Sequence, residues 1–171
     1  MTTELTKDHS QKLVDGPVLA VDLGQKLVGV AISDDLLITI KRLVPLKRTN
    51  WKRLLHDVRG LLEGFDAKTL VIGLPLRLDG SSGEVALEVK RLAANFAKSL
   101  DLPVYLQDER LTSFEARENL KSEHNEQEIQ KLIDGEAAAI ILRDFLESSE
   151  DRILVSPDVV IPNPEQETNR E

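Results

Sequence analysis

The sequence predicts an α/β fold in which a mixed five-stranded sheet carries helices on both faces. Three apolar runs rich in β-branched residues, joined by short polar links, fill residues 17–46 and predict three hairpin-connected antiparallel strands. From Trp51 onward, apolar residues at helical spacing alternate with short strands of the buried type. Antiparallel strands followed by strand–helix alternation are typical of a mixed sheet that is covered on both sides.

The individual elements follow from local signals. The three strands are expected at residues 17–24, 27–34 and 36–46, and the links between them are residues 24–26 and 34–35. A helix should begin at Trp51 and end at Gly64. The run TLVIGL, which ends at Leu74, reads as a short buried strand and is followed by a loop over residues 75–82.

Two capping boxes predict the next helix starts. Ser81 with Glu84 opens a helix that extends to about Leu100, and Thr112 with Glu115 opens another. A strand is expected between them at residues 103–107, and a final helix at residues 126–146. This order of elements, β-β-β-α-β-α-β-α-α, is that of a ribonuclease-H-like layout.

Composition limits the class of protein. The chain has 171 residues, 22 basic and 30 acidic, for a net charge of −8, and no cysteine. The length fits one domain, and the missing cysteine excludes a disulfide scaffold, a cysteine zinc site and a thiol nucleophile. No apolar run approaches the roughly 20 residues that cross a bilayer. The polar start does not resemble a secretory signal, so we expect a soluble cytoplasmic protein.

The two ends differ from the middle. Residues 1–16 read as a flexible leader and residues 17–147 as the folded domain. Residues 148–171 read as an acidic tail that contains three prolines. Within this tail, the segment ILVSPDVVI could lie against the domain as an extended arm.

Three carboxylates stand where chemistry could use them. Asp22 lies in an apolar strand, where a charge is costly unless it is paired or bound to a metal. Glu109 follows the last strand, with Asp108 as its rival, and strand alternation lets only one of these two face the site. Asp134 lies on the final helix. Each also has a structural interpretation, such as an ion pair between Glu109 and its neighbour.

Carboxylates without a histidine or cysteine partner favour hard cations, Mg²⁺ or Mn²⁺. Such a site suits phosphodiester hydrolysis. We therefore interpret the three carboxylates as a metal site of a nuclease.

A basic stretch points to a polyanion. Residues 41–59 carry seven basic side chains and one acidic side chain in an otherwise acidic chain. The alternative is a solvated helix face. Trp51 fits a core position better than a base-stacking platform. The candidate nucleic-acid-binding residues, in this stretch and beside the strand ends, are Lys26, Lys47, Arg48, Lys52, Arg53, Arg77 and Arg110.

Four motifs resemble one family. VDLGQKLVGVAISD, VIGLPLRLDGSSGE, QDERLTSFEA and KLIDGEAAAIIL, in this order and spacing, are similar to the YqgF/RuvX family of ribonuclease-H-like nucleases and Holliday junction resolvases. The resemblance implies that Asp22, Glu109 and Asp134 form the acidic catalytic and metal-binding triad. It also implies a role in maturing the 5′ end of precursor 16S ribosomal RNA. Gln25 departs from the family, in which a small residue is common at this position.

Four hypotheses follow. The first is a metal-dependent nuclease of ribosomal RNA maturation, and the second is a Holliday junction resolvase or DNA repair nuclease, which would tend to dimerise. We expect a monomer or a weak homodimer. The third is an actin-like ATPase, for which the chain is too short to supply both domains. The fourth is a non-catalytic RNA-binding assembly factor, because carboxylates alone do not establish turnover.

Overall fold

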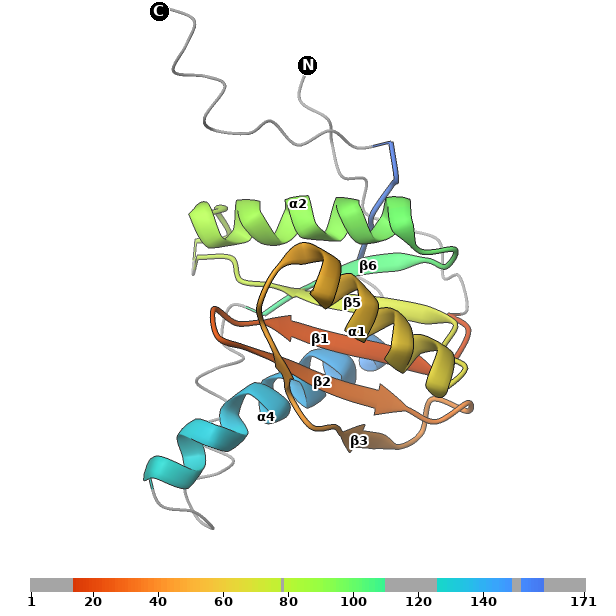
Figure 1. Cartoon of the computed structure of the whole chain (residues 1–171), viewed down its shortest axis with the longest axis horizontal. Helices are drawn as coiled ribbons and strands as arrows, with labels where there is room; N and C mark the ends of the chain where they lie inside the picture. Colours follow the sequence, from red (N-terminus) through yellow and green to blue (C-terminus); the bar gives the residue numbers. More distant parts are fainter. Residues whose placement is uncertain (1–13, 78, 110–125, 149–151, 159–171) are drawn as a thin grey trace, which may run out of the picture.

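The computed structural model describes residues 14–77, 79–109, 126–148 and 152–158, and the side chains of residues 126–135 are outside this description. The predicted mixed α/β fold is confirmed: one sheet is covered by helices α1 (Trp51–Gly64) and α2 (Glu84–Ser99) on one face and by α4 (Glu126–Glu147) on the other (Figure 1). No helix in the described part of the chain is long and apolar enough to cross a membrane.

The sheet has the strand order β3-β2-β1-β5-β6-β7, and β4 also pairs with β2. β1 (Val18–Leu23) lies at its centre, antiparallel to β2 (Leu27–Ser33) and parallel to β5 (Thr69–Leu74). β5 is parallel to β6 (Val104–Asp108). The carboxyl ends of β1, β5 and β6 therefore meet at one edge of the sheet.

The expected strand at residues 36–46 is wrong, because two short strands, β3 (Ile40–Arg42) and β4 (Leu46–Lys47), replace it. The turn before β3 is longer than expected, since the carboxylate of Asp34 accepts backbone N–H groups from Ile38 and Thr39 at 2.7 and 2.9 Å. Between the two strands stands Pro45, which has no N–H group to donate to a ladder.

A seventh strand lies inside the expected acidic tail. β7 (Arg152–Leu154) pairs antiparallel with the outer edge of β6, and the next residue, Val155, is buried in the core. The segment that could serve as an extended arm thus contributes a strand. With β3 and β4 in place of one strand and β7 added, the sheet has seven strands instead of the predicted five.

The start of α2 also differs from the prediction. Its N-cap is Gly83, without a side-chain cap, so Ser81 does not form the expected capping box. Instead, the backbone N–H of Ser81 donates to the carboxylate of Asp79, and its carbonyl accepts the N–H of Arg77. The helix expected from Thr112 lies outside the described residues.

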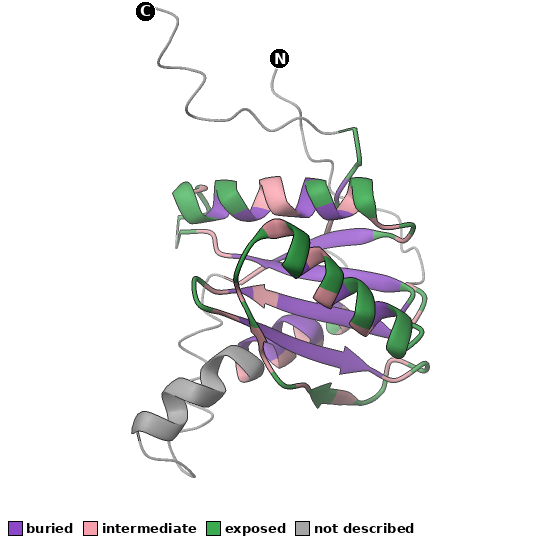
Figure 2. Ribbon diagram, in the orientation of Figure 1, coloured by how far each residue is buried: buried purple, intermediate pink, exposed green. Residues whose placement is uncertain are grey.

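Alternation along β1 divides the core into two layers. Leu19, Val21 and Leu23 pack with residues of α1 and α2, whereas Val18 and Ala20 pack with residues of α4. The four long strands are almost entirely buried (Figure 2). Because side chains alternate, a polar residue at position 22 faces the α4 side of the sheet.

Candidate active site

Asp22 is the one charged residue of β1 and is partly buried. It lies opposite Gly29 of β2, one residue beyond the Val21–Ile72 pair that joins β1 to β5. The backbone N–H of Gly24 donates to the carbonyl of Asp22 at 3.1 Å, which turns the chain into the β1–β2 hairpin. Asp22 is therefore held at the edge where the parallel strands end.

Glu109 reaches the same edge from β6. Its N–H donates to the carbonyl of Leu74 at 3.0 Å, so the parallel pairing of β5 and β6 continues one residue past the strand. Glu109 follows Tyr105 by four positions, and Tyr105 packs in the α4 layer. Alternation therefore puts Glu109 on the α4 face with Asp22, and Asp108 on the opposite face.

The two carboxyl groups are in direct contact. A side-chain hydrogen bond joins Glu109 to Asp22. Burial, followed by the charge of Asp22, the hydrogen bond and the charge of Asp108, raises the pKa of Glu109 well above its ordinary value. A hydrogen bond between two carboxyl groups needs a proton on one of them, and the raised pKa of Glu109 favours that proton. Asp22 and Glu109 are 87 positions apart in the sequence, and the fold brings them together.

Gly73 on β5 makes room for this pair. A Cβ atom on Gly73 would lie 2.7 Å from Oε2 and 2.8 Å from Cδ of Glu109, and it would also collide with Ile141 of α4. Any side chain at this position would have to displace both the carboxylate of Glu109 and the end of the Ile141 side chain. A glycine inside an otherwise apolar strand is the signal for such a close approach.

The remaining acidic candidate, Asp134, lies on α4 in the part whose side chains are not described. The described side chains contain no group of three residues that could hold a metal ion. What they contain is the Asp22–Glu109 pair. Carboxylate oxygens in contact, with no nitrogen or sulfur ligand, fit a hard divalent cation, which would replace the shared proton.

The predicted basic residues separate into groups. Lys26 lies in the β1–β2 turn, and Lys47 on β4 pairs with Leu27 on β2, the residue after Lys26. Both lysines are exposed, near the edge of the sheet that carries Asp22. Lys52 and Arg53 are exposed on α1, on the face opposite α4, and Arg53 pairs with Asp57 at 3.2 Å. The fold therefore brings two lysines to the edge of the site and leaves two residues on a separate face.

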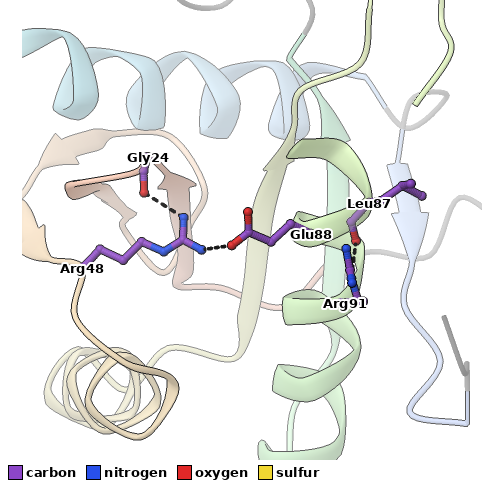
Figure 3. A network of polar contacts seen from close by, with 5 residues as sticks. All are labelled: Gly24, Arg48, Leu87, Glu88 and Arg91. Atoms are coloured by element: carbon purple, nitrogen blue, oxygen red, sulfur yellow. Dashed lines mark hydrogen bonds and ion pairs between the residues drawn. The ribbon is translucent and has the colours of Figure 1, made fainter. Parts of the chain in front are cut away.

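Three other predicted residues are placed differently. Arg48 is half-buried and bonds to the protein itself, to the carbonyl of Gly24 and to Glu88 (Figure 3). Arg77 lies against the N-cap of α2, where a Cβ on Gly83 would be 3.3 Å from its Nε. Arg110 lies outside the described residues. Trp51 meets Phe96 edge-on, with ring centroids 4.8 Å apart, as expected for a core position.

A mixed sheet of this order, with paired carboxyl groups at the carboxyl edge of its central strands, defines a ribonuclease-H-like fold of the resolvase type. T. thermophilus RuvC, solved in complex with a Holliday junction substrate, has the same fold, with a TM-score of 0.50 and 16% identity over 81% of this chain and 98% of that one. The chain belongs to the RuvX family, described as Holliday junction resolvase, which it matches over residues 16–148.

Two relatives in this family are similar at the sequence level. The protein of Gloeothece citriformis is 41% identical over 130 residues, which cover 75% of this chain and 86% of that protein. The protein of Lactobacillus johnsonii is 39% identical over 137 residues, with 77% and 96% covered. Both carry the name "Putative pre-16S rRNA nuclease".

Proposed function

We propose that this protein is a divalent-cation-dependent nuclease that hydrolyses phosphodiester bonds at the 5′ end of precursor 16S ribosomal RNA. The observation that carries the proposal is the contact between the carboxyl groups of Asp22 and Glu109 at the carboxyl edge of the sheet. Such a pair is unstable as two free anions, and a divalent cation held by the two carboxylates would stabilise it.

Asp22 and Glu109 would hold Mg²⁺ or Mn²⁺, and Asp134 would complete the set. When bound, the cation supplies charge neutralisation at the scissile phosphate and activates water as a nucleophile. The carboxylates bind and orient it, and the partly buried setting strengthens their electrostatic effect.

The exposed lysines supply contacts to the substrate. Lys26 and Lys47 flank the edge that carries Asp22, so they can hold the phosphates next to the scissile bond. Lys52 and Arg53, on the other face, would contact more distant parts of a large substrate. This arrangement positions a nucleic-acid backbone and does not select a base.

The choice of RNA rests on the names of the two relatives. Cleavage of four-way DNA junctions is the second candidate function, because the family is described as Holliday junction resolvase. A junction resolvase cuts two strands symmetrically and would work as a dimer.

The test uses the purified full-length chain with three labelled substrates: precursor 16S RNA that spans the 5′ end, single-stranded DNA and a four-way DNA junction. Each is incubated with Mg²⁺, with Mn²⁺ or with chelator. We expect cation-dependent cleavage of the RNA, and loss of that cleavage in Asp22→Asn. Preference for the junction would favour the second candidate.

Asp108→Asn is the matched control. Like Asp22→Asn, this substitution removes one negative charge, but Asp108 lies on the opposite face of the sheet, so cleavage should persist. Full activity of Asp22→Asn would contradict the proposed site. Binding of RNA without cleavage under any condition would instead identify a non-catalytic RNA-binding assembly factor.

A further inference from the structure

Arg48 connects three separate parts of the chain (Figure 3). Its Nη1 donates to the carbonyl of Gly24 at 2.9 Å, and its Nη2 donates to Oε1 of Glu88 on α2 at 2.5 Å. Its backbone N–H donates to the carbonyl of Lys26 at 3.0 Å. The β1–β2 turn is thus bonded at both ends by one residue, and the same residue joins it to a helix.

The turn that Arg48 holds is the one that leaves Asp22. The Gly24 N–H bonds back to the carbonyl of Asp22, and the Gly24 carbonyl accepts from Arg48. Gly24 is therefore fixed on both its donor and its acceptor side. Movement of this peptide would shift the backbone that carries Asp22 and the exposed side chain of Lys26.

The side chain of Arg48 is 18% exposed, whereas that of Glu88 is 53% exposed. Both terminal nitrogens of the guanidinium group are used within the protein. A planar fork can reach a carbonyl and a carboxylate at once, which a lysine ammonium on a flexible stem does less well. Lys47, the preceding residue, is exposed and free to meet solvent or substrate.

We propose that Arg48 is a positioning residue of the active site: it fixes the turn behind Asp22 against α2, and it does not contact the nucleic acid. The inference deepens the proposed function and rests on it for its effect on cleavage. Its structural part, the fixing of the turn, stands independently and can be measured without any cleavage.

The first measurement is amide hydrogen exchange of the cation-free protein over peptides that cover residues 23–28. In Arg48→Met and Arg48→Lys, exchange should become faster in this turn and remain unchanged in β5. Lys47→Met, at the neighbouring exposed position, should leave the turn protected. Unchanged protection in both Arg48 variants would overturn the proposal.

The second measurement is the salt dependence of RNA binding. For a single-stranded substrate, each phosphate contact contributes about 0.7 to the slope of log affinity against log salt. Lys47→Met should lower the slope by about this amount, whereas Arg48→Met should leave it unchanged. A lower slope in Arg48→Met that is restored in Arg48→Lys would mean that Arg48 contacts phosphate, which also overturns the proposal.

The third measurement is single-turnover cleavage at saturating RNA. Misplacement of a reacting group costs on the order of tenfold to a hundredfold in rate, so we expect a loss of this size in both Arg48 variants with little change in RNA affinity. Glu88→Ala, which keeps the arginine but removes its anchor, should give a smaller loss in the same direction. The wild type could cleave no substrate while the Arg48 variants still show faster exchange in the turn. That result would support the fixing of the turn by Arg48 and contradict the nuclease proposal.

Discussion

Gly73 on β5 and Glu109, one residue past the end of β6, lie so close together that a methyl group added to Gly73 would be only 2.7 Å from Oε2 of Glu109. The relationship makes a strand glycine part of the candidate active site although it has no side chain. It also explains how two carboxyl groups and a helix can share one small region of the sheet.

Gly73→Ala should therefore weaken cation binding and cleavage. The added Cβ would lie within 3 Å of both Ile141 and Glu109, so both side chains must shift, and the shift of Glu109 moves the carboxylate pair. We expect Mn²⁺ affinity, measured by isothermal titration, to fall by on the order of tenfold to a hundredfold, the range seen when the surroundings of metal ligands are disturbed. Wild-type affinity would contradict the account of the site.

Gly60→Ala is the control for this substitution. Gly60 lies on α1, and a Cβ atom added there would have no neighbour within 4 Å, so alanine fits without a clash. Alanine favours the helix over glycine, and we expect a gain of about 0.5–1 kcal/mol in the free energy of unfolding. Cleavage should not change.

The stability of the cation-free protein should depend on pH through Glu109. Its pKa in the folded chain is raised above 4.5, mainly by burial and by the charge of Asp22. As the pH rises past 4.5, the unfolded chain loses this proton and the folded chain keeps it, so stability falls until Glu109 itself ionises. In chelator, the melting temperature of the wild type relative to Glu109→Gln should therefore fall as the pH rises above about 4.5.

Cation binding should release the same proton. Isothermal titration with Mn²⁺ in two buffers of different ionisation enthalpy measures the number of protons released. At a pH just above 4.5, where the raised pKa keeps Glu109 protonated, the wild type should release more protons than Glu109→Gln. Equal release by the two proteins, or parallel melting curves in chelator, would mean that the pair does not share a proton.

The side chain of Gln107, two residues before Glu109, should lower the free energy of unfolding. It is 2% exposed, and its Oε1 has no hydrogen-bond partner among the described groups. An unsatisfied buried carbonyl costs about 1–3 kcal/mol, so Gln107→Leu should increase the free energy of urea unfolding. Thr69→Val is the opposite case. Thr69 is also buried, but its hydroxyl donates a hydrogen bond to the carbonyl of Asp15 at 2.9 Å. Loss of this hydrogen bond should lower the free energy of unfolding. A Gln107→Leu variant that is less stable would point to a partner for Oε1.

Trp51 should report on helix packing and not on substrate. It is the one tryptophan of the chain and meets the buried ring of Phe96 edge-on. Trp51→Leu should cost about 1 kcal/mol through loss of this contact, with RNA affinity unchanged. Saturating RNA should leave the fluorescence of Trp51 unaltered, and strong quenching would indicate base stacking.

The pairing of Asp22 with a second carboxylate could be predicted from the sequence because a charged side chain inside an apolar strand is costly unless it has a partner. Asp22 within an apolar strand demands a partner, and alternation allowed only one of Asp108 and Glu109 to face it. The sequence did not say which one, because that choice depends on the register of β6 against β5. It also did not predict the closeness of Gly73, which depends on where α4 crosses the sheet.

Arg48 and β7 illustrate two further limits. A count of charges places Arg48 in a basic stretch, but its role is set by a carbonyl 24 residues away in the chain. β7 is three residues long and lies in an acidic, proline-containing part of the sequence, so it is too short to show the alternation of apolar and polar residues that predicts a strand. Its place in the fold comes from the free edge of β6, a tertiary feature that a local pattern does not contain.

The last strand has a consequence for how the chain can be shortened. β7 covers the outer edge of β6, and the guanidinium of Arg152 bonds to the carbonyl of Phe145 on α4 at 2.6 Å. A chain cut after residue 148 would lose both, and β6 would present unpaired N–H and C=O groups to any other extended segment. Exposed edges of this kind template aggregation. A newly synthesised chain has the same unprotected edge until residues 152–154 have left the ribosome and paired with β6.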